Sequence, residues 1–145
     1  MSKIDLKIII ALSRANQAIL KKIEKSMNKN GLTVSEFGVM ELLLHKGKQP
    51  VQKIAERILV TSGTITYVIN KLIKKGYIKR ERCNEDKRIY YVDLTEEGRI
   101  FIEKVFKEHE KYLSKLFQEI DNNDKKDLIE KLNLFENVAK QYKEW

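Results

Sequence analysis

Small polar side chains gather near the middle of the chain, and amide and basic side chains follow them at helical spacing. The first group is Ser62, Gly63, Thr64, Thr66 and Tyr67, and the second is Asn70, Lys71 and Lys74. Small hydrogen-bonding groups at the start of a helix suit the base edges in the DNA major groove, and lysines further along suit the phosphates. The ordered set predicts a DNA-contacting helix, whereas Thr66 or Tyr67 alone is better explained by an ordinary solvated helix face.

A second charged cluster, Asp86-Lys87-Arg88, lies between two runs of strand-like sequence. These runs predict a hairpin that has the cluster at its turn. A basic hairpin tip suits the narrow, electronegative minor groove of DNA, so Lys87 and Arg88 are further candidate DNA-binding residues. Asp86, two residues before Arg88, is predicted to brace the turn through a salt bridge. The alternative is a charged turn that is simply solvated.

The net charge of +8 is concentrated in the same part of the chain. Residues 46–88 contain twelve Lys and Arg against four Asp and Glu, and the rest of the chain contains seventeen of each sign. The positive excess therefore lies wholly in the segment that holds both clusters. This confinement favours a polyanionic partner over a solvated basic surface.

The segment around these clusters is predicted to form two helices and a hairpin. Apolar periodicity predicts a short helix over 51–58 with Pro50 in its first turn, a second helix from the break at 61–64 to Lys75, and strands over 77–82 and 89–94. A short helix, a tight turn, a second helix and a hairpin together make a winged helix-turn-helix.

Longer helices are predicted on both sides of this segment. The first covers residues 4–27, and a capping box of Thr33 and Glu36 opens the next. Thr95 caps a long helix that follows the hairpin, and a last helix follows a polar loop at 121–124. The first helix and the last two carry more apolar surface than one small winged domain covers, so we predict a homodimer. Residues expected at or near its interface are Leu12, Ile19, Leu116, Leu132 and Phe135.

The predicted fold is mainly α with a small β-hairpin wing: a winged helix-turn-helix with a helical dimerisation region. We divide it into an N-terminal dimerisation helix (1–31), a winged helix-turn-helix DNA-binding domain (32–95) and C-terminal dimerisation helices (96–145). These three parts are expected to form one compact domain overall.

Several motifs, in this order, resemble the MarR family of bacterial regulators. They are Leu32–Phe37, Ile54-Ala55, Gly63–Thr66, Leu72–Gly76, Asp86–Arg88 and Val92–Gly98. The resemblance covers roughly residues 30–100, and the wing followed by Leu-Thr-x-x-Gly is its most specific element. It implies a homodimer of interlocked outer helices that binds a palindromic operator in double-stranded DNA, usually as a repressor. It also implies that residues 62–71 contact the major groove, that Arg88 enters the minor groove and that Asp86 braces it.

The resemblance further implies release from DNA by a small ligand or by oxidation. An aromatic or phenolic acid is the expected ligand, and candidate pocket residues near the joints at 30–32 and 94–98 are Leu12, Phe37, Met40 and Phe101. Core or dimer interface is the alternative for each of them. Peroxide-sensing members carry a reactive cysteine near the N-terminus, which this chain lacks. Cys83, at the end of the first wing strand, is a possible redox site, or else an incidental half-exposed thiol.

The sequence argues against an enzyme. It has no glycine-rich phosphate loop, no Ser/His/Asp arrangement and no metal-ligand cluster, so we expect neither a metal nor a cofactor. A winged helix that binds an acidic protein is the second alternative, disfavoured by the small polar residues where bases would be contacted. No segment suits a signal peptide or a membrane span, and a single cysteine fits a cytoplasmic protein.

Overall fold

Of the first two helices, the second begins at a side-chain cap that the sequence supplies, whereas the first has no side-chain cap at its start. In the computed structural model, which describes residues 3–58 and 62–144, α1 spans Ile4–Asn28 and α2 spans Val34–Lys46. Gly31 turns the chain between them with φ 73°, in the left-handed region that favours glycine. The predicted capping box is present, because the Glu36 N–H donates to Thr33 Oγ1 (3.1 Å) and the Thr33 N–H donates to Glu36 Oε1 (3.0 Å).

The helix-turn-helix consists of α3 (Val51–Ile58) and α4 (Ser62–Lys74), as predicted. One face of α4 is closed against the domain: its buried side chains are Ile65, Val68, Ile69 and Leu72. Their spacing of three and four residues follows the period of the α-helix, so the other face of α4 is left to solvent. Gly76, with φ 81°, then turns the chain from the end of α4 towards the wing.

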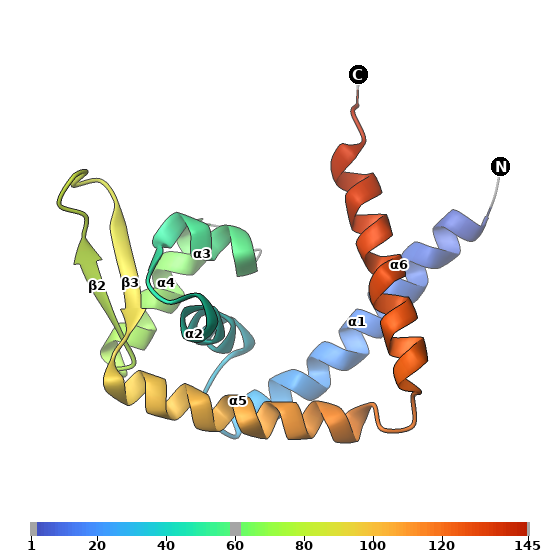
Figure 1. Ribbon diagram of the computed structural model, residues 1–145, viewed down its shortest axis with the longest axis horizontal. Helices are drawn as coiled ribbons and strands as arrows, with labels where there is room; N and C mark the ends of the chain where they lie inside the picture. The colour runs from blue at the N-terminus through green and yellow to red at the C-terminus, as the bar shows by residue number, and fades with distance from the viewer. Residues whose placement is uncertain (1–2, 59–61, 145) are drawn as a thin grey trace. The chain divides into compact units, whose positions relative to one another are not determined.

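The wing is a three-stranded antiparallel sheet in the order β1-β3-β2. The predicted hairpin is formed by β2 (Ile78–Arg82) and β3 (Tyr90–Leu94), which stands beside α3 and α4 in Figure 1. The third strand, β1 (Gln49–Pro50), pairs with β3 and was not predicted. Pro50 therefore ends a short edge strand and directly precedes α3, instead of lying in its first turn. An edge strand tolerates proline because no partner needs its missing N–H.

The start of α5 (Glu96–Leu116) packs tightly against the segment before β2. Thr95 caps this helix as predicted: its Oγ1 accepts the Gly98 N–H (3.0 Å), and its hydroxyl donates to the Gly76 carbonyl (2.6 Å). Gly98 is buried, and a Cβ at this position would lie 1.9 Å from the Tyr77 carbonyl oxygen. The glycine of the Leu-Thr-x-x-Gly motif is thus required by a close backbone approach.

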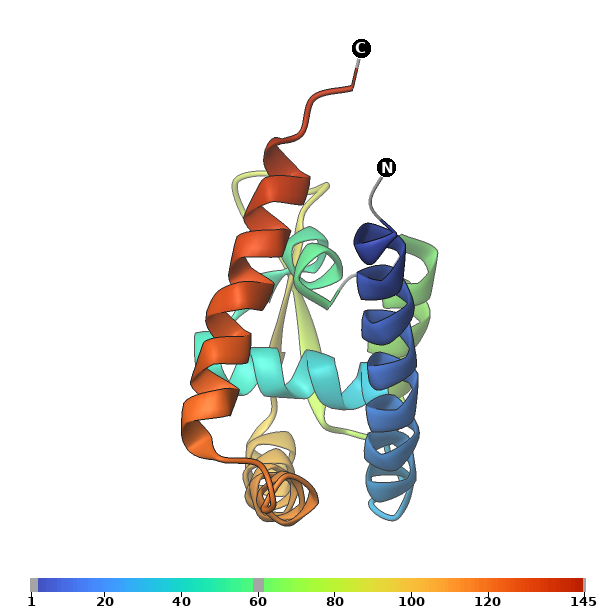
Figure 2. The same ribbon diagram turned by 90° about the vertical axis from the view of Figure 1, so that its right-hand side faces the viewer.

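The chain divides into two compact units, Met1–His109 and Glu110–Trp145. The hydrophobic core lies in the first unit, where α2 runs crosswise to α1 (Figure 2). Its most completely buried apolar side chains are Met27, Leu32, Val39, Met40, Leu43, Ile54, Ile65, Ile69, Leu72, Val92, Ile102 and Val105. The second unit contains the end of α5 and α6 (Asn122–Gln141), and none of the residues of α6, all of which the structure describes, is buried.

The predicted fold class is confirmed: the structure is mainly helical and carries a winged helix-turn-helix. The functional division at 32 and 95 stays a prediction, since contacts within the chain group the residues up to His109 together. None of the helices in the described ranges has the length and hydropathy that crossing a membrane would require.

Candidate nucleic-acid interface

The face of α4 that points away from the core carries the residues predicted to contact DNA. Thr64, Thr66, Tyr67, Asn70, Lys71 and Lys74 are all exposed. Tyr67 is 63% exposed although it is a large aromatic residue, and the Lys71 ammonium lies 5.4 Å from the centre of its ring. Ser62 and Gly63 belong to the first turn of α4, but their side chains lie outside the part of the chain that is described.

The wing tip is braced as the sequence predicted. Asp86 accepts three hydrogen bonds from Arg88: from the backbone N–H (3.0 Å), from Nε (3.1 Å) and from Nη2 (3.1 Å). These bonds from Arg88 hold the pKa of the Asp86 carboxyl below its usual value. The Arg88 side chain is nevertheless 90% exposed, so its guanidinium is oriented by Asp86 while remaining open to a partner. Lys87 is also exposed.

A cluster that the sequence reasoning missed joins the wing to α4. Arg80 Nη2 donates to Asn70 Oδ1 (3.0 Å), and the Arg80 guanidinium lies 5.4 Å from the centre of the Tyr90 ring. Arg82 also lies over this ring, at 5.2 Å, and donates to the Tyr90 hydroxyl. We call Arg80, Asn70, Tyr90 and Arg82 the wing–helix cluster. Alternation along β2 places both arginines on one side, but the contacts with α4 and β3 depend on the tertiary fold.

Arg80 lines two hollows. One, of about 200 Å³, is lined by Pro50, Val51, Gln52, Thr66, Arg80, Arg88, Ile89 and Tyr90. The other, of about 450 Å³, is lined by Tyr67, Asn70, Lys71, Ile73, Lys74 and Arg80. Arg80 is common to both hollows, so one basic side chain of β2 borders a hollow that α4 residues line and a hollow that Arg88 lines.

A half-buried ion pair connects the residue after α4 to the start of α2. Lys75 Nζ lies 2.7 Å from Glu36 Oε2 and donates to the Gly31 carbonyl (2.9 Å), while the Glu36 side chain is only 2% exposed. Burial by itself raises the pKa of Glu36. The hydrogen bonds from Lys75 and Thr33 and the charge of Lys75 together lower it by more, so the pKa of Glu36 lies below its usual value. The end of α4 is therefore tied both to the α1–α2 turn and to the start of α2.

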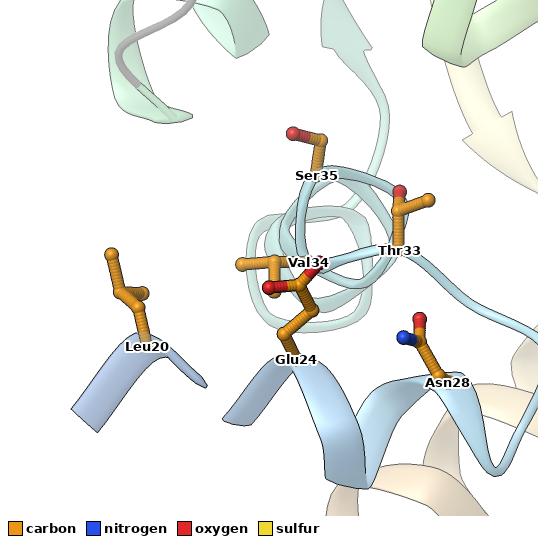
Figure 3. A pocket seen from close by; sticks show the side chains of 6 residues that line it. All are labelled: Leu20, Glu24, Asn28, Thr33, Val34 and Ser35. Carbon is orange, nitrogen blue, oxygen red and sulfur yellow. The ribbon is translucent and has the colours of Figure 1, made fainter. Parts of the chain in front are cut away.

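The residues proposed to line a ligand pocket lie in different environments. Phe37 and Met40 belong to the closed core, Phe101 stacks on Tyr77 at 4.5 Å between ring centres, and Leu12 is 39% exposed on α1. A hollow of about 360 Å³ does lie beside the predicted joint at 30–32, but other residues line it (Figure 3). They are Leu20, Glu24 and Asn28 of α1 and Thr33, Val34 and Ser35 at the start of α2.

The single cysteine lies at the base of the wing tip. Cys83 is half-buried, and its backbone N–H donates to the Ile89 carbonyl (2.8 Å). Within the described ranges, His, Cys, Asp and Glu side chains nowhere gather in groups of three or more that would suit a metal ion.

Large apolar side chains remain exposed in both units. In the first unit they include Ile4, Leu6, Ile9, Ile10, Leu12 and Leu20 of α1. In the second they include Leu128, Ile129, Leu132, Leu134, Phe135 and Val138 of α6. Contiguous exposed apolar surface of this kind is typical of a binding interface.

Comparison with known proteins identifies what this arrangement resembles. The sequence profile of the MarR family matches residues 32–90. The HTH-type transcriptional regulator MhqR of Bacillus subtilis (strain 168) is 35% identical over 142 residues, which are 98% of this chain and 98% of that protein. The fold matches that of reduced AbfR bound to DNA, with a TM-score of 0.76 and 22% identity over 96% of each chain. It also matches BpsR of Bordetella bronchiseptica, whose DNA binding is regulated by 6-hydroxynicotinic acid, with a TM-score of 0.81 and 19% identity over 90% of this chain and 98% of that one.

Proposed function

This chain belongs to the MarR family of helix-turn-helix transcriptional regulators, and we propose that it acts as a homodimeric repressor on a palindromic operator. The observation that carries the proposal is the exposed polar face of α4 beside a basic, braced wing. A helix of this kind fits the major groove, and a hairpin beside it reaches the adjacent minor groove.

Each exposed group has a proposed role. Thr66 and Tyr67, in the first half of α4, contact base edges in the major groove, with Ser62, Gly63 and Thr64 at its start. Lys71 and Lys74 lie further along the helix and bind backbone phosphates. Arg88 enters the minor groove, supported by Lys87, while Asp86 fixes the direction of its guanidinium.

The homodimer is supported by the exposed apolar surfaces of α1 and, separately, of the Glu110–Trp145 unit. Covering such surface in a second copy removes apolar area from water, which stabilises the association. A two-fold dimer places two α4 helices on half-sites whose centres lie about one DNA turn, ~10 bp, apart. The proposed operator is therefore an inverted repeat.

The first test is the selection of binding sites from random DNA with the full-length protein. We expect an inverted repeat with that spacing. Tyr67→Ala or Thr66→Ala should change which bases are selected, because a base contact is worth about 1–3 kcal/mol. Lys74→Ala serves as the control and should weaken binding nearly equally on all sequences. Selected sites without inverted symmetry would contradict the dimeric reading.

We further propose that a small aromatic acid releases the repressor from DNA. 6-Hydroxynicotinic acid, which regulates DNA binding by the structurally similar BpsR, belongs to this chemical class and supports the choice. Its proposed binding region is the joint between α1 and α2, beside the hollow that Leu20, Glu24 and Val34 help to line. The competing proposal is oxidation of Cys83, which would place a polar adduct at the wing.

The variant Cys83→Ser separates these two switches. If an aromatic acid releases it from the operator as it releases the wild type, the pocket is the switch. Loss of the response to peroxide, with DNA binding retained, would instead identify the thiol. A third candidate function, binding of an acidic protein rather than DNA, would be indicated by loss of binding with salt but no preference for any DNA sequence.

A further inference from the structure

The wing–helix cluster lies where a DNA backbone must pass. If α4 occupies the major groove and the wing tip the adjacent minor groove, the sugar-phosphate strand that separates the two grooves runs between them. Arg80 lies at that position, because it contacts Asn70 of α4 and Tyr90 of β3 and lines both hollows. This step rests on the proposed function.

Arg80 is held in place before any ligand arrives. One guanidinium N–H is bound to Asn70 Oδ1 at 3.0 Å, and the plane lies over the ring of Tyr90. Arg82 in turn holds the Tyr90 hydroxyl, which restricts the ring. A guanidinium carries five N–H donors, so one bond to Asn70 leaves several for a ligand. Because its side chain is already oriented, Arg80 loses less conformational entropy on binding than a free surface arginine.

The chemistry of the smaller hollow suits a phosphate. Two arginines, Arg80 and Arg88, line it together with the first residues of α3, Val51 and Gln52. The start of a helix presents unpaired N–H groups and a partial positive charge, which favour anions. We infer that Arg80 binds a single phosphate of the DNA strand between the two grooves and so fixes α4 and the wing in one register on the duplex.

This assignment also revises the role of Asn70. Its amide oxygen is the acceptor for Arg80, so Asn70 is a positioning residue for the phosphate site rather than a reader of bases through that oxygen. Replacement of Asn70 should therefore weaken binding without changing the selected sequence.

The experiment measures DNA affinity over a salt series for wild type and Arg80→Ala. Fluorescence anisotropy is read on two labelled duplexes of equal length, one selected by the wild-type protein and one of random sequence. Loss of one phosphate contact should lower the slope of log K against log salt by about 0.9 per protomer and should weaken binding to both duplexes alike. Lys79→Ala is the matched control, since it removes an exposed positive charge from the neighbouring position of β2, on the opposite side of the strand.

A second measurement locates the phosphate. Neutral methylphosphonate is introduced at each backbone position of the selected duplex in turn, and each duplex is titrated with both proteins. At one position per half-site the replacement should weaken binding of the wild type several-fold but leave the affinity of Arg80→Ala unchanged, because the contact is already lost. Arg80→Gln keeps a polar side chain of similar length and provides the same comparison if the alanine variant unfolds.

Two results would overturn the inference while leaving the proposed function intact. One is a salt slope in Arg80→Ala equal to that of the wild type, which would make Arg80 only a strut between β2 and α4. The other is a fall in the slope of log K against log salt in Lys79→Ala equal to the fall in Arg80→Ala. That result would mean that loss of any positive charge on β2 lowers the slope, without a specific phosphate contact. A wild-type protein that binds DNA with no sequence preference would instead overturn the proposed function together with the inference.

Discussion

At the scale of single residues, the absence of a side chain at Gly98 allows α5 to pack against the backbone that precedes β2. Gly98 has the Tyr77 carbonyl so near its Cα that a methyl group cannot be accommodated without moving backbone. The neighbouring hydrogen bonds, from the Thr95 hydroxyl to Gly76 and from the Thr95 N–H to Tyr77, hold that backbone in place. The strain of a substitution therefore cannot be relieved locally.

We predict that Gly98→Ala destabilises the protein by about 1–3 kcal/mol or more, as overpacked core substitutions do. Gly38→Ala is the matched control. Gly38 also lies in a helix, but a Cβ there would meet Ile58 Cγ2 at an ordinary 3.5 Å. Its alanine variant should be unchanged or more stable by roughly 0.5–1 kcal/mol, since alanine favours helix over glycine. Urea unfolding followed by circular dichroism compares them, and equal stability of the two variants would refute the packing argument.

At the scale of elements, the Lys75–Glu36 pair connects three segments that are distant in sequence. Lys75 follows α4, Glu36 opens α2, and the Gly31 carbonyl belongs to the turn after α1. The same Glu36 carboxylate closes the capping box through its other oxygen. A shift of α1 would therefore be transmitted to the end of the helix that we propose contacts DNA through a charged contact, in addition to the core to which Met27 of α1 belongs.

We predict that Lys75→Met destabilises the protein by about 1–3 kcal/mol at pH 7. This is less than the 3–5 kcal/mol typical of breaking a fully buried pair, because the Lys75 side chain is 33% exposed.

The pKa of Glu36 is depressed in the folded state. Its contribution to the free energy of unfolding is therefore present above the pKa that it has when unfolded and is lost as the pH falls through the lower, folded value. Acidification from pH 7 to below about 4 should therefore narrow the difference in free energy of unfolding between wild type and Glu36→Gln, measured by urea unfolding at each pH. A difference independent of pH would contradict this account.

At the scale of the whole molecule, the apolar side chains left exposed in each unit are the observation that supports the proposed dimer. Leu128, Leu132 and Phe135 follow one another at spacings of four and three, and all three are exposed within the single chain. The same period that makes one face of α4 the core side makes one face of α6 an uncovered apolar stripe. We attribute that stripe to the proposed dimer interface.

We predict that Phe135→Glu shifts the protein from a dimer towards a monomer of 17.1 kDa, measured by analytical ultracentrifugation at micromolar concentration. A charge buried in an apolar interface without a partner costs several kcal/mol. Asn137→Glu is the control, because it adds the same charge two residues later, on the opposite side of α6. A monomeric wild type would contradict the dimer itself, and a dimeric Phe135→Glu would exclude this stripe from the interface.

The amino-acid sequence by itself determined the elements whose signals are local. The capping box at Thr33, the buried face of α4, the brace between Asp86 and Arg88 and the cap at Thr95 all involve residues within a few positions of one another, so periodicity and side-chain chemistry sufficed. The family resemblance rested on the same local motifs. The roles of the proposed DNA-binding residues remain predictions, although their exposure follows from the same helical period.

Only the tertiary structure decided which distant segments meet. The pairing of β1 with β3, the contact of Lys75 with Glu36, the approach of Gly98 to Tyr77 and the bond from Arg80 to Asn70 were absent from the sequence reasoning. A periodic pattern states which face of an element is apolar, but not which residue of another element lies opposite. That choice follows from the simultaneous packing of all the elements around one core. It is why Phe101 of α5 stacks on Tyr77 and why Arg80 of β2 contacts Asn70 of α4.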